Sequence, residues 1–350
     1  MGTFRRWCAV FALGVIVQAS TVHAVQPVPL FEDPGTPEAF TTATIVDLPT
    51  TIVKDENFTP IAYCDSACND SSGGVAGCWA GDGYNWRDTL SLFLGYEGSK
   101  QPQDFGVNAH FGGRTAINWG VPLVEDWGLG FQIGSAINAS SNAVQVNERV
   151  EGNSSRTQSF TTVGLFQRLD NGLKWGVAHD FLYQRYYDDF TLSQWRGYFG
   201  YQLSQRNEVG VRMAFHEKED EGFFGTSGVQ LRAIDQGSVY WRHTFQQGAQ
   251  LGCWFGVAEG HNEPNIALGD LPRQNGVFAY GSDVFCPITD RMALFGEANF
   301  LTPADTGTVD AFLGVEIFPW GGARRGRSRR FSPVQSVGGN TSMSVDLRRL

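Results

Sequence analysis

The stretch WGLGFQIG, from Trp127 to Gly134, places a large apolar residue at each odd position and a glycine or glutamine at each even one. The stretch from Asp104 to Val121 follows the same pattern, with Phe, Val, Ala and Phe at positions 105, 107, 109 and 111. It ends with Ile, Trp and Val at positions 117, 119 and 121. A β-strand turns successive side chains to opposite faces, so each stretch predicts a strand with one apolar face and one small or polar face.

Runs of this kind recur over most of the chain. The expected strands are 86–98, 104–121, 126–138, 156–169, 173–187, 191–204, 208–217, 226–245, 249–259, 275–286, 291–301 and 308–319. They number about 12, and bacterial outer-membrane barrels usually have an even number of strands. We therefore expect an all-β fold: an antiparallel up-and-down β-barrel of about 12 strands, of the outer-membrane type.

The connections between these strands alternate in length. Short turns are expected at 122–125, 170–172, 204–207, 246–248 and 287–290, and longer loops at 139–155, 217–225, 260–274 and 302–307. An outer-membrane barrel has short periplasmic turns and long outer loops in alternation. The pattern requires 226–245 to be one strand; if Asp235-Gln236-Gly237 is a turn, the alternation breaks there.

Aromatic residues supply a second indication. Trp119, Trp127, Trp175 and Trp241 fall near the short-turn ends of their strands on the apolar face, which predicts an aromatic girdle at a membrane boundary. The other rim would carry Tyr183, Tyr187 and Trp195. The alternative is that the tryptophans fill a soluble core, and His179 in mid-strand on the apolar face argues against the girdle.

The first 24 residues read as a secretory signal. Arg5 and Arg6 precede an apolar stretch from Trp7 to Val17, and cleavage is expected after Ala24. An uncleaved anchor helix is the alternative, but the stretch is shorter than the ~20 residues that span a bilayer. We expect secretion across the inner membrane and a place in the cell outer membrane, with outer-membrane lipid as the partner.

The remaining chain divides by composition. Residues 25–84 are rich in Pro, Thr, Asp and Gly, which predicts a flexible leader with a cysteine-containing segment. Residues 85–320 are expected to form the barrel, and residues 321–350 a basic linker and C-terminal tail. Without the signal the net charge is 24 − 36 = −12, which argues against nucleic acid as a partner.

In an oxidising compartment Cys64, Cys68 and Cys78 are expected to form a disulfide rather than a metal site, and their odd number leaves a thiol free or paired elsewhere.

Four segments resemble a family of secreted, β-rich planctomycete proteins of unassigned function that are similar to outer-membrane barrels. They are Leu90–Lys100 (LSLFLGYEGSK), Ile117–Leu123 (INWGVPL), Trp175–Leu203 with the core YQRYYDDFTLSQWRGYFGYQL, and Asp283–Pro303 (DVFCPITDRMALFGEANFLTP). The resemblance covers most of the strand region and implies the fold and the location. It brings no catalytic or binding motif, and the run Arg324–Arg330 (RRGRSRR) is not a feature of that family.

Charged residues mark the face that would line the lumen. The pore-lining candidates are Lys174, Arg196, Arg212, Arg232 and Arg242 on one side and Glu297, Asp310 and Glu316 on the other. A basic wall opposite an acidic wall would set a field across a pore and select polar solutes. The alternative is that these charges pair across a narrow lumen and close it. Both remain open at this stage.

No group of residues in the sequence forms a convincing catalytic site, and we expect no enzyme. His179-Asp180 and Asp188-Asp189 offer acids and a base, but adjacent strand residues face opposite ways, so His179 and Asp180 would not share a site. The loop HEKEDE, His216–Glu221, is a weak signal for a divalent cation, and no cofactor is expected.

The tail offers two readings of its own. Arg324–Arg330 would emerge at the periplasmic end as a solvated linker, and 341–347 alternates again, as an extra strand or a segment tucked against the barrel end.

These patterns predict a porin-like passive channel or a structural envelope protein of the outer membrane. A channel for small polar solutes predicts ion conductance that falls when Arg196 and Arg212 are neutralised. The alternative is a soluble or surface-attached secreted β-protein that binds a partner through its long loops. The sequence leaves the solute and the oligomeric state open.

Overall fold

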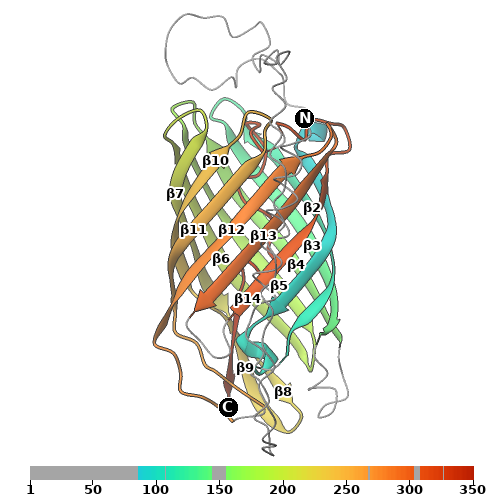
Figure 1. Ribbon diagram of the computed structural model, residues 1–350, viewed down its shortest axis with the longest axis vertical. Coiled ribbons are helices and arrows are strands. Elements are labelled where there is room, and N and C mark those ends of the chain that lie inside the picture. Colours follow the sequence, from blue (N-terminus) through green and yellow to red (C-terminus); the bar gives the residue numbers. More distant parts are fainter. Residues whose placement is uncertain (1–85, 107, 144–154, 267–268, 303–307, 326) are drawn as a thin grey trace, which may run out of the picture. The chain divides into compact units, whose positions relative to one another are not determined.

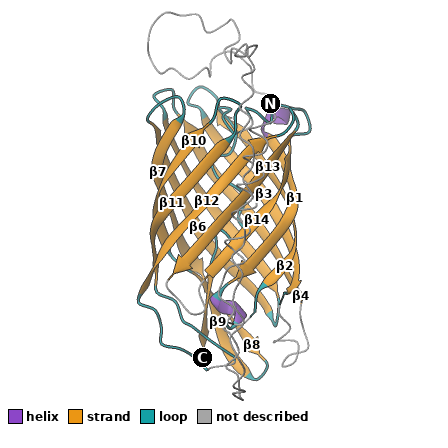
Figure 2. Cartoon of the chain, in the orientation of Figure 1, coloured by secondary structure: helices purple, strands orange, loops and turns teal. Residues whose placement is uncertain are grey.

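The computed structural model describes residues 86–350, apart from 107, 144–154, 267–268, 303–307 and 326. The regular secondary structure of this part of the chain is almost wholly strand, with two short 3₁₀ helices (Figure 2). The helices are η1 (Trp86–Thr89) and η2 (Pro102–Asp104). No helix among the described residues is long and apolar enough to cross a membrane.

Twelve strands close into an antiparallel barrel in the order β1-β14-β13-β12-β11-β10-β7-β6-β5-β4-β3-β2 (Figure 1). They are β1 (Leu90–Lys100), β2 (His110–Val124), β3 (Leu129–Asn142), β4 (Ser155–Arg168), β5 (Leu173–Arg185), β6 (Asp189–Gln202), β7 (Asn207–Lys218), β10 (Gln236–Thr244), β11 (Gln250–Glu259), β12 (Gly276–Pro287), β13 (Met292–Thr302) and β14 (Thr308–Ile317). Closure comes from β1 and β14, where Leu94 lies opposite Val315. The predicted fold class is confirmed.

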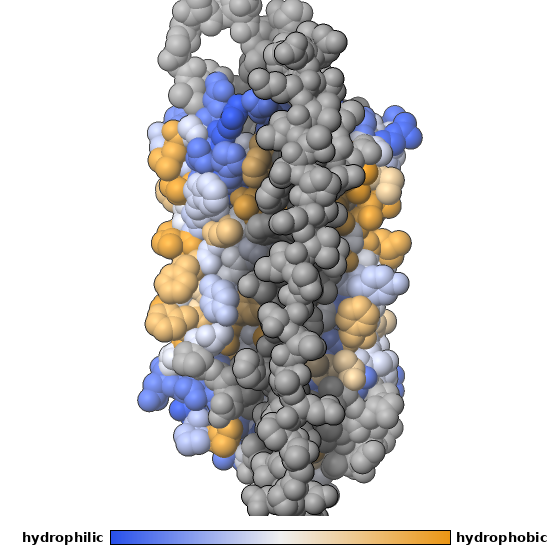
Figure 3. Space-filling model, in the orientation of Figure 1, coloured by the Kyte–Doolittle hydropathy of each residue, from blue (hydrophilic) through white to orange (hydrophobic). Residues whose placement is uncertain are grey.

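The faces of the strands follow the alternation in the sequence. On β5 the outward side chains include Val177 and Phe181, which are exposed, whereas the inward Asp180 and Gln184 are buried. The barrel therefore has an apolar outside and a largely polar inside, the reverse of a soluble protein. Apolar residues lie on the visible flanks of the barrel and hydrophilic residues at both of its ends (Figure 3).

The expected single strand 226–245 is two strands. β8 (Asp220–Phe224) and β9 (Ser227–Ala233) form a hairpin beyond the end of the barrel, and the chain re-enters the wall only as β10. The break at Asp235 does not reverse the chain, so the long connection from β7 to β10 remains. The expected alternation of short turns and long loops fails elsewhere, because only residues 186–188 connect β5 to β6, where the alternation requires a long loop. Arg232, predicted to line the pore, therefore lies on the projecting sheet and not on the barrel wall.

The chain ends at this same projecting sheet. β15 (Val345–Arg349) pairs with β9 to give the order β15-β9-β8, and the C-terminus lies beside them (Figure 1). The alternation in 341–347 thus marks a strand that leaves the barrel count at twelve.

The expected strand 104–121 starts late, at His110. Pro102 begins η2, and Phe105 has a φ of 53°, a left-handed conformation that no strand residue adopts. β1 therefore ends at Lys100, before η2, and the first residues of the expected strand 104–121 are not part of a strand.

Candidate functional site: a lumen filled by the C-terminal segment

The chain reverses sharply after β14 and turns back into the barrel. Gly321 and Gly322 have φ values of 93° and 84°, which a residue with a Cβ adopts only with strain. The backbone N–H of Ala323 then donates to the carbonyl of Asp290, in the short turn between β12 and β13. Arg327–Ser344, called the plug from here on, follows this turn and ends at the projecting sheet, where Ile234 N donates to Ser344 O.

Inward side chains of the wall bind the main chain of the plug. The carbonyl oxygens that accept these bonds belong to Ser332, Pro333, Gln335, Ser336, Val337, Gly338, Ser342 and Met343. Most of the donors lie on β2, β3, β4 and β6; Arg196 Nη2, for example, lies 2.8 Å from Ser336 O, and Gln132 Nε2 lies 2.9 Å from Gln335 O. In the opposite sense, Gly338 N donates to Thr162 Oγ1 at 2.8 Å. The lumen therefore satisfies the backbone of a segment that forms no regular structure of its own.

Charge and apolar packing hold both ends of the plug. Arg327 lies 3.1 Å from Glu316 and 3.8 Å from Asp283, with its guanidinium 3.9 Å above the ring of Phe295. At the far end Met343 is fully buried in an apolar cluster with side chains of the wall and the projecting sheet and with Phe105, which follows η2. The expectation that Arg324–Arg330 forms a solvated linker is wrong for Arg327, because the wall supplies two carboxylates for it.

Glycines on the inward face leave room for the plug. A Cβ at Gly120 would lie 2.1 Å from the carbonyl oxygen of Phe331, and one at Gly176 would lie 2.5 Å from a methyl of Val334. Both distances are far inside van der Waals contact, so the path of the plug depends on the missing side chains. On the outward face of β2, a Cβ at Gly113 would meet nothing within 4 Å.

We expect Gly120→Val to displace the plug, because its main chain cannot share the space of the new side chain. Overpacking of this kind costs ~1–3 kcal/mol or more. Protease cleavage within 327–344 should become faster in the folded barrel, and Gly113→Val on the same strand is the matched control. Equal cleavage rates for the two variants would show that Gly120 does not set the path of the plug.

The predicted pore-lining charges mostly face inward, but they are paired. Lys174 contacts Glu208 at 2.5 Å, Arg196 contacts Asp180 at 2.5 Å, Arg242 contacts Asp283 at 3.3 Å, Arg212 contacts Glu297 at 3.6 Å, Glu316 contacts Arg327, and Asp310 accepts from Gln101 at 2.9 Å. β7 and β13 are separated by three strands, so the Arg212–Glu297 pair crosses the lumen. The expected basic wall is interrupted by its own acids, Asp180 and Glu208. The sequence interpretation did not name Glu208 and considered Asp180 only for catalysis, although the inward parity of both is as clear as that of Arg196.

The outer surface carries the predicted girdle residues. Trp127 and Trp241 are exposed, the first at 70%, while Trp119 and Trp175 are half-buried. All four lie toward the short-turn ends of their strands or in a short turn, and their role at a membrane boundary stays a prediction. Tyr187 lies at the other end of the barrel, between β5 and β6, but its ring packs against Phe105 and Phe224 in the buried cluster and does not face outward.

The residues considered for catalysis face different sides of the wall or shape a loop. His179 and Asp180 face opposite sides of the wall, and His179 contacts Glu217 on the outside. Asp188 accepts the backbone N–H groups of Asp189 and Phe223, each at 2.9 Å, and so shapes a loop.

The disulfide candidates Cys64, Cys68 and Cys78 lie outside the described residues. Cys286 takes part in a disulfide, and Cys253 is a free thiol on the outer surface.

A buried ion pair lies where η2 meets the wall. Asp104 and Arg156 are both at least 99% buried, 3.2 Å apart, with His110 3.3 Å from the same carboxylate oxygen. Burial alone would raise the pKa of Asp104, but Arg156 and His110 outweigh it and hold that pKa below its ordinary value.

The pairing of β15 with β9, called the clasp from here on, holds the chain where the plug ends. It contains a second buried acid. Asp346 accepts the backbone N–H of Asn262 at 2.8 Å, and Arg273 lies 3.9 Å away. Arg232 is its partner in the β9–β15 register. Burial raises the pKa of Asp346 from 3.8 to about 6, against the opposing effects of Asn262, His261 and Arg273.

We expect this clasp to loosen as the pH rises. A carboxyl whose folded pKa is raised contributes stability that is complete below its ordinary value of 3.8 and is lost as the pH passes about 6. The change is of the order of 1–3 kcal/mol. Amide exchange of 345–349, corrected for its intrinsic pH dependence, should be slower at pH 5 than at pH 8. Asp346→Asn should remove the difference; a difference that persists in this variant would assign it to another group.

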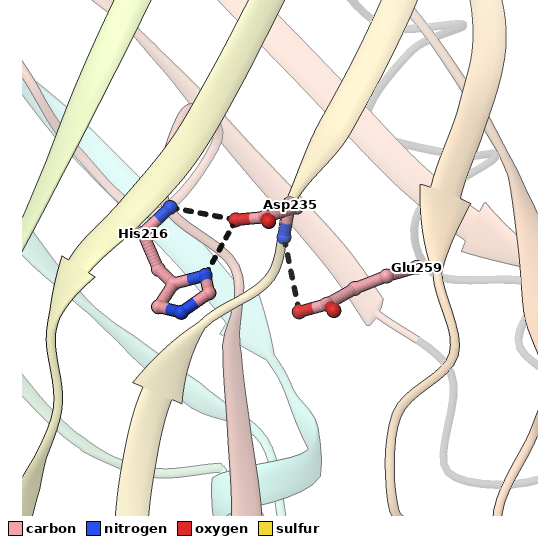
Figure 4. A group of neighbouring side chains, drawn as sticks. All are labelled: His216, Asp235 and Glu259. Carbon is pink, nitrogen blue, oxygen red and sulfur yellow. Dashed lines mark hydrogen bonds and ion pairs between the residues drawn. The ribbon is translucent and has the colours of Figure 1, made fainter.

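Three side chains gather at the mouth of the barrel next to this clasp. His216 from β7, Asp235 from the β9–β10 link and Glu259 from β11 each offer one ligand atom, all within 4.8 Å of one another. His216 donates to Asp235 Oδ1 from its backbone at 2.6 Å, its Nδ1 lies 2.8 Å from the same oxygen, and Asp235 N lies 3.3 Å from Glu259 Oε1 (Figure 4). Of the acidic loop suggested by the sequence, only His216 belongs to this group.

Comparison with known proteins supplies a family. No curated protein matches the chain. Solved structures with a similar fold include an outer membrane channel from Pseudomonas putida F1, at 11% identity, with 69% of this chain and 97% of that chain covered and a TM-score of 0.45. Outer membrane phospholipase A from Escherichia coli gives 10% identity, 65% and 95% coverage and a TM-score of 0.36. The model of a family of unknown function, DUF6666, matches residues 89–345, from the start of the barrel to β15. The chain belongs to this DUF6666 family.

Proposed function

We propose that this protein is an outer-membrane channel that its own C-terminal plug holds closed. The observation that carries the proposal is the inverted barrel, apolar outside and polar inside, with Arg327–Ser344 bound along its lumen. The outward face supports a lipid environment, since large apolar side chains such as Phe255, Val239 and Phe278 are more than half exposed.

The interior supports a channel over a barrel packed for stability alone. Arg196, Lys174 and Arg242 have acidic partners on the wall itself, so these charges stay compensated when the plug leaves. A lumen lined in this way can fill with water, and small polar solutes are the class it would pass. With the plug in place, the bore of a 12-strand barrel is occupied.

Envelope fractionation and planar bilayers test the proposal together. The protein should stay in the membrane through a carbonate wash, migrate differently on gels before and after heating, and give little ion current as the full chain. Release by the wash would instead support the soluble, loop-binding protein. A large steady current from the full chain would contradict the closed state.

A single substitution tests the lipid contact. Val239 lies on the outer face of β10 and is 61% exposed. In lipid, Val239→Arg should lower the free energy of unfolding by ~2–4 kcal/mol if the residue lies near the midplane. In water the change should stay within ~0.5 kcal/mol. Gln247→Arg in the exposed turn after β10 is the control, and urea unfolding in lipid vesicles is the measurement.

A further inference from the structure

We propose that His216, Asp235 and Glu259 bind a divalent transition-metal ion of the Zn²⁺ type at the mouth of the barrel. The three residues come from three separate segments, β7, the β9–β10 link and β11, and their side chains point toward one another (Figure 4). One imidazole nitrogen with two carboxylate oxygens is a donor set that Zn²⁺ accepts, with water in the remaining position.

Each carboxylate has an oxygen to offer. The hydrogen bonds to Asp235 use Oδ1, and those to Glu259 use Oε1. Asp235 Oδ2 and Glu259 Oε2 accept no hydrogen bond from any described residue. Ligand atoms at ~2.0–2.2 Å from a tetrahedral Zn²⁺ ion stand roughly 3.3–3.6 Å apart. The three ligand atoms lie within 4.8 Å of one another, so the side chains would have to approach by about 1 Å to hold the ion.

The charge of the group also favours a cation. Two carboxylates face one positive side chain, Arg232, which lies 2.6 Å from Glu259 Oε1. With a neutral imidazole the group has a net charge of −1, and a divalent ion would reverse that sign. The side chains of His216, Asp235 and Glu259 are 31%, 31% and 28% exposed. Water and ions can therefore reach the group without any opening of the barrel.

Binding at this point would connect the mouth of the barrel to the clasp on the plug. Asp235 lies two residues after β9, the strand that pairs with β15. An ion that joins Asp235 to β7 and β11 would hold β9 in place. The inference does not depend on conduction, because the metal site can be measured in a closed barrel.

The test uses the full chain in detergent, stripped with a chelator and then titrated with ZnCl₂. The unmodified protein should retain one more equivalent of Zn²⁺ after gel filtration than His216→Asn. His243→Asn on neighbouring β10 is the matched control, because His243 contacts Asn207 and no carboxylate, and it should bind as the unmodified protein does. Gel migration before and after heating confirms that each variant is folded. This difference in the number of bound ions distinguishes the site at the mouth of the barrel from any other Zn²⁺ site in the chain.

Two further results decide the assignment. Removing a group that hydrogen-bonds to a metal ligand typically weakens metal affinity by ~10–100-fold. Because His216→Asn removes a ligand itself, we expect it to weaken Zn²⁺ binding by at least about 100-fold. Arg232→Gln removes the competing charge beside Glu259 and should strengthen binding, by up to about tenfold. Equal Zn²⁺ binding by the unmodified protein and His216→Asn would overturn the proposal. So would competition by Ca²⁺ at equal concentration, because Ca²⁺ takes oxygen ligands and has no use for the imidazole.

Discussion

A chain that ends at Trp320 should form a conducting barrel, with a unitary ion current at least about tenfold above that of the full chain. The truncation removes Arg327–Ser344 and the clasp on β9 but none of the twelve barrel strands. Water would then replace the plug as the partner of Arg114, Arg168 and Gln132, which now bind its carbonyl groups. Planar-bilayer recording of the two chains is the measurement.

Two controls make the result specific to the plug. A synthetic peptide of residues 321–350 added to the truncated barrel should reduce the current, and a scrambled peptide should not. Heat-dependent gel migration must show that the truncated barrel is folded. A folded but silent truncated barrel would mean that wall side chains fill the lumen alone, which would favour a structural envelope protein.

The sequence also predicts that conductance falls when Arg196 is neutralised, and the truncated chain is the form in which to test this. Arg196 binds the plug at Ser336 and pairs with Asp180. Neutralising Arg196 in the full chain would disturb the plug as well as the wall. In the truncated chain the same change alters only the lining, so a fall in current would report on the field in the lumen.

The barrel was predictable because its strands carry their own signal. An apolar residue at every second position fixes which side chains share a face, and the Asp-Asn-Gly turn at 170–172 fixes a hairpin. Parity does not say what a face contacts. Val229, Leu231 and Val239 have the same parity, yet the first two are buried beneath the barrel and the third faces outward. This is why Arg232 was assigned to the pore.

The plug was not predictable for a different reason. It is bound mainly through backbone carbonyl groups, which every residue has, and its serines, glycines and arginines show no period. The only trace in the sequence lies on the wall. Glycines at 120 and 176 stand on inward positions where the plug passes. The proposed metal-binding group is equally hidden in the sequence, because strand pairing brings His216, Asp235 and Glu259 together. β7 pairs with β10 across a long connection, and β10 pairs with β11 across a short turn.

Arg156→Met should be the most destabilising single change to the wall, at ~3–5 kcal/mol, because it leaves the Asp104 carboxylate buried without its main cation. Arg156 lies on β4 and Asp104 in η2, so the pair joins the wall to the segment next to the projecting sheet. Urea unfolding of the folded barrel is the measurement. Arg185→Met on β5 is the matched control, since that arginine is exposed and its loss should cost less than ~0.5 kcal/mol.

The pH dependence of this loss identifies its cause. Arg156 and His110 hold the pKa of Asp104 below 3.8, so its contribution is present above that value and is lost as the pH falls below it. Without Arg156 that pKa should rise, and the carboxyl should take up a proton at a higher pH. The penalty of Arg156→Met should therefore be larger at pH 7.5 than at pH 4. The double variant Arg156→Met with Asp104→Asn should recover most of the stability at pH 7.5. A penalty that is the same at both pH values and persists in the double variant would assign the loss to the packing of the Arg156 side chain instead of to its charge.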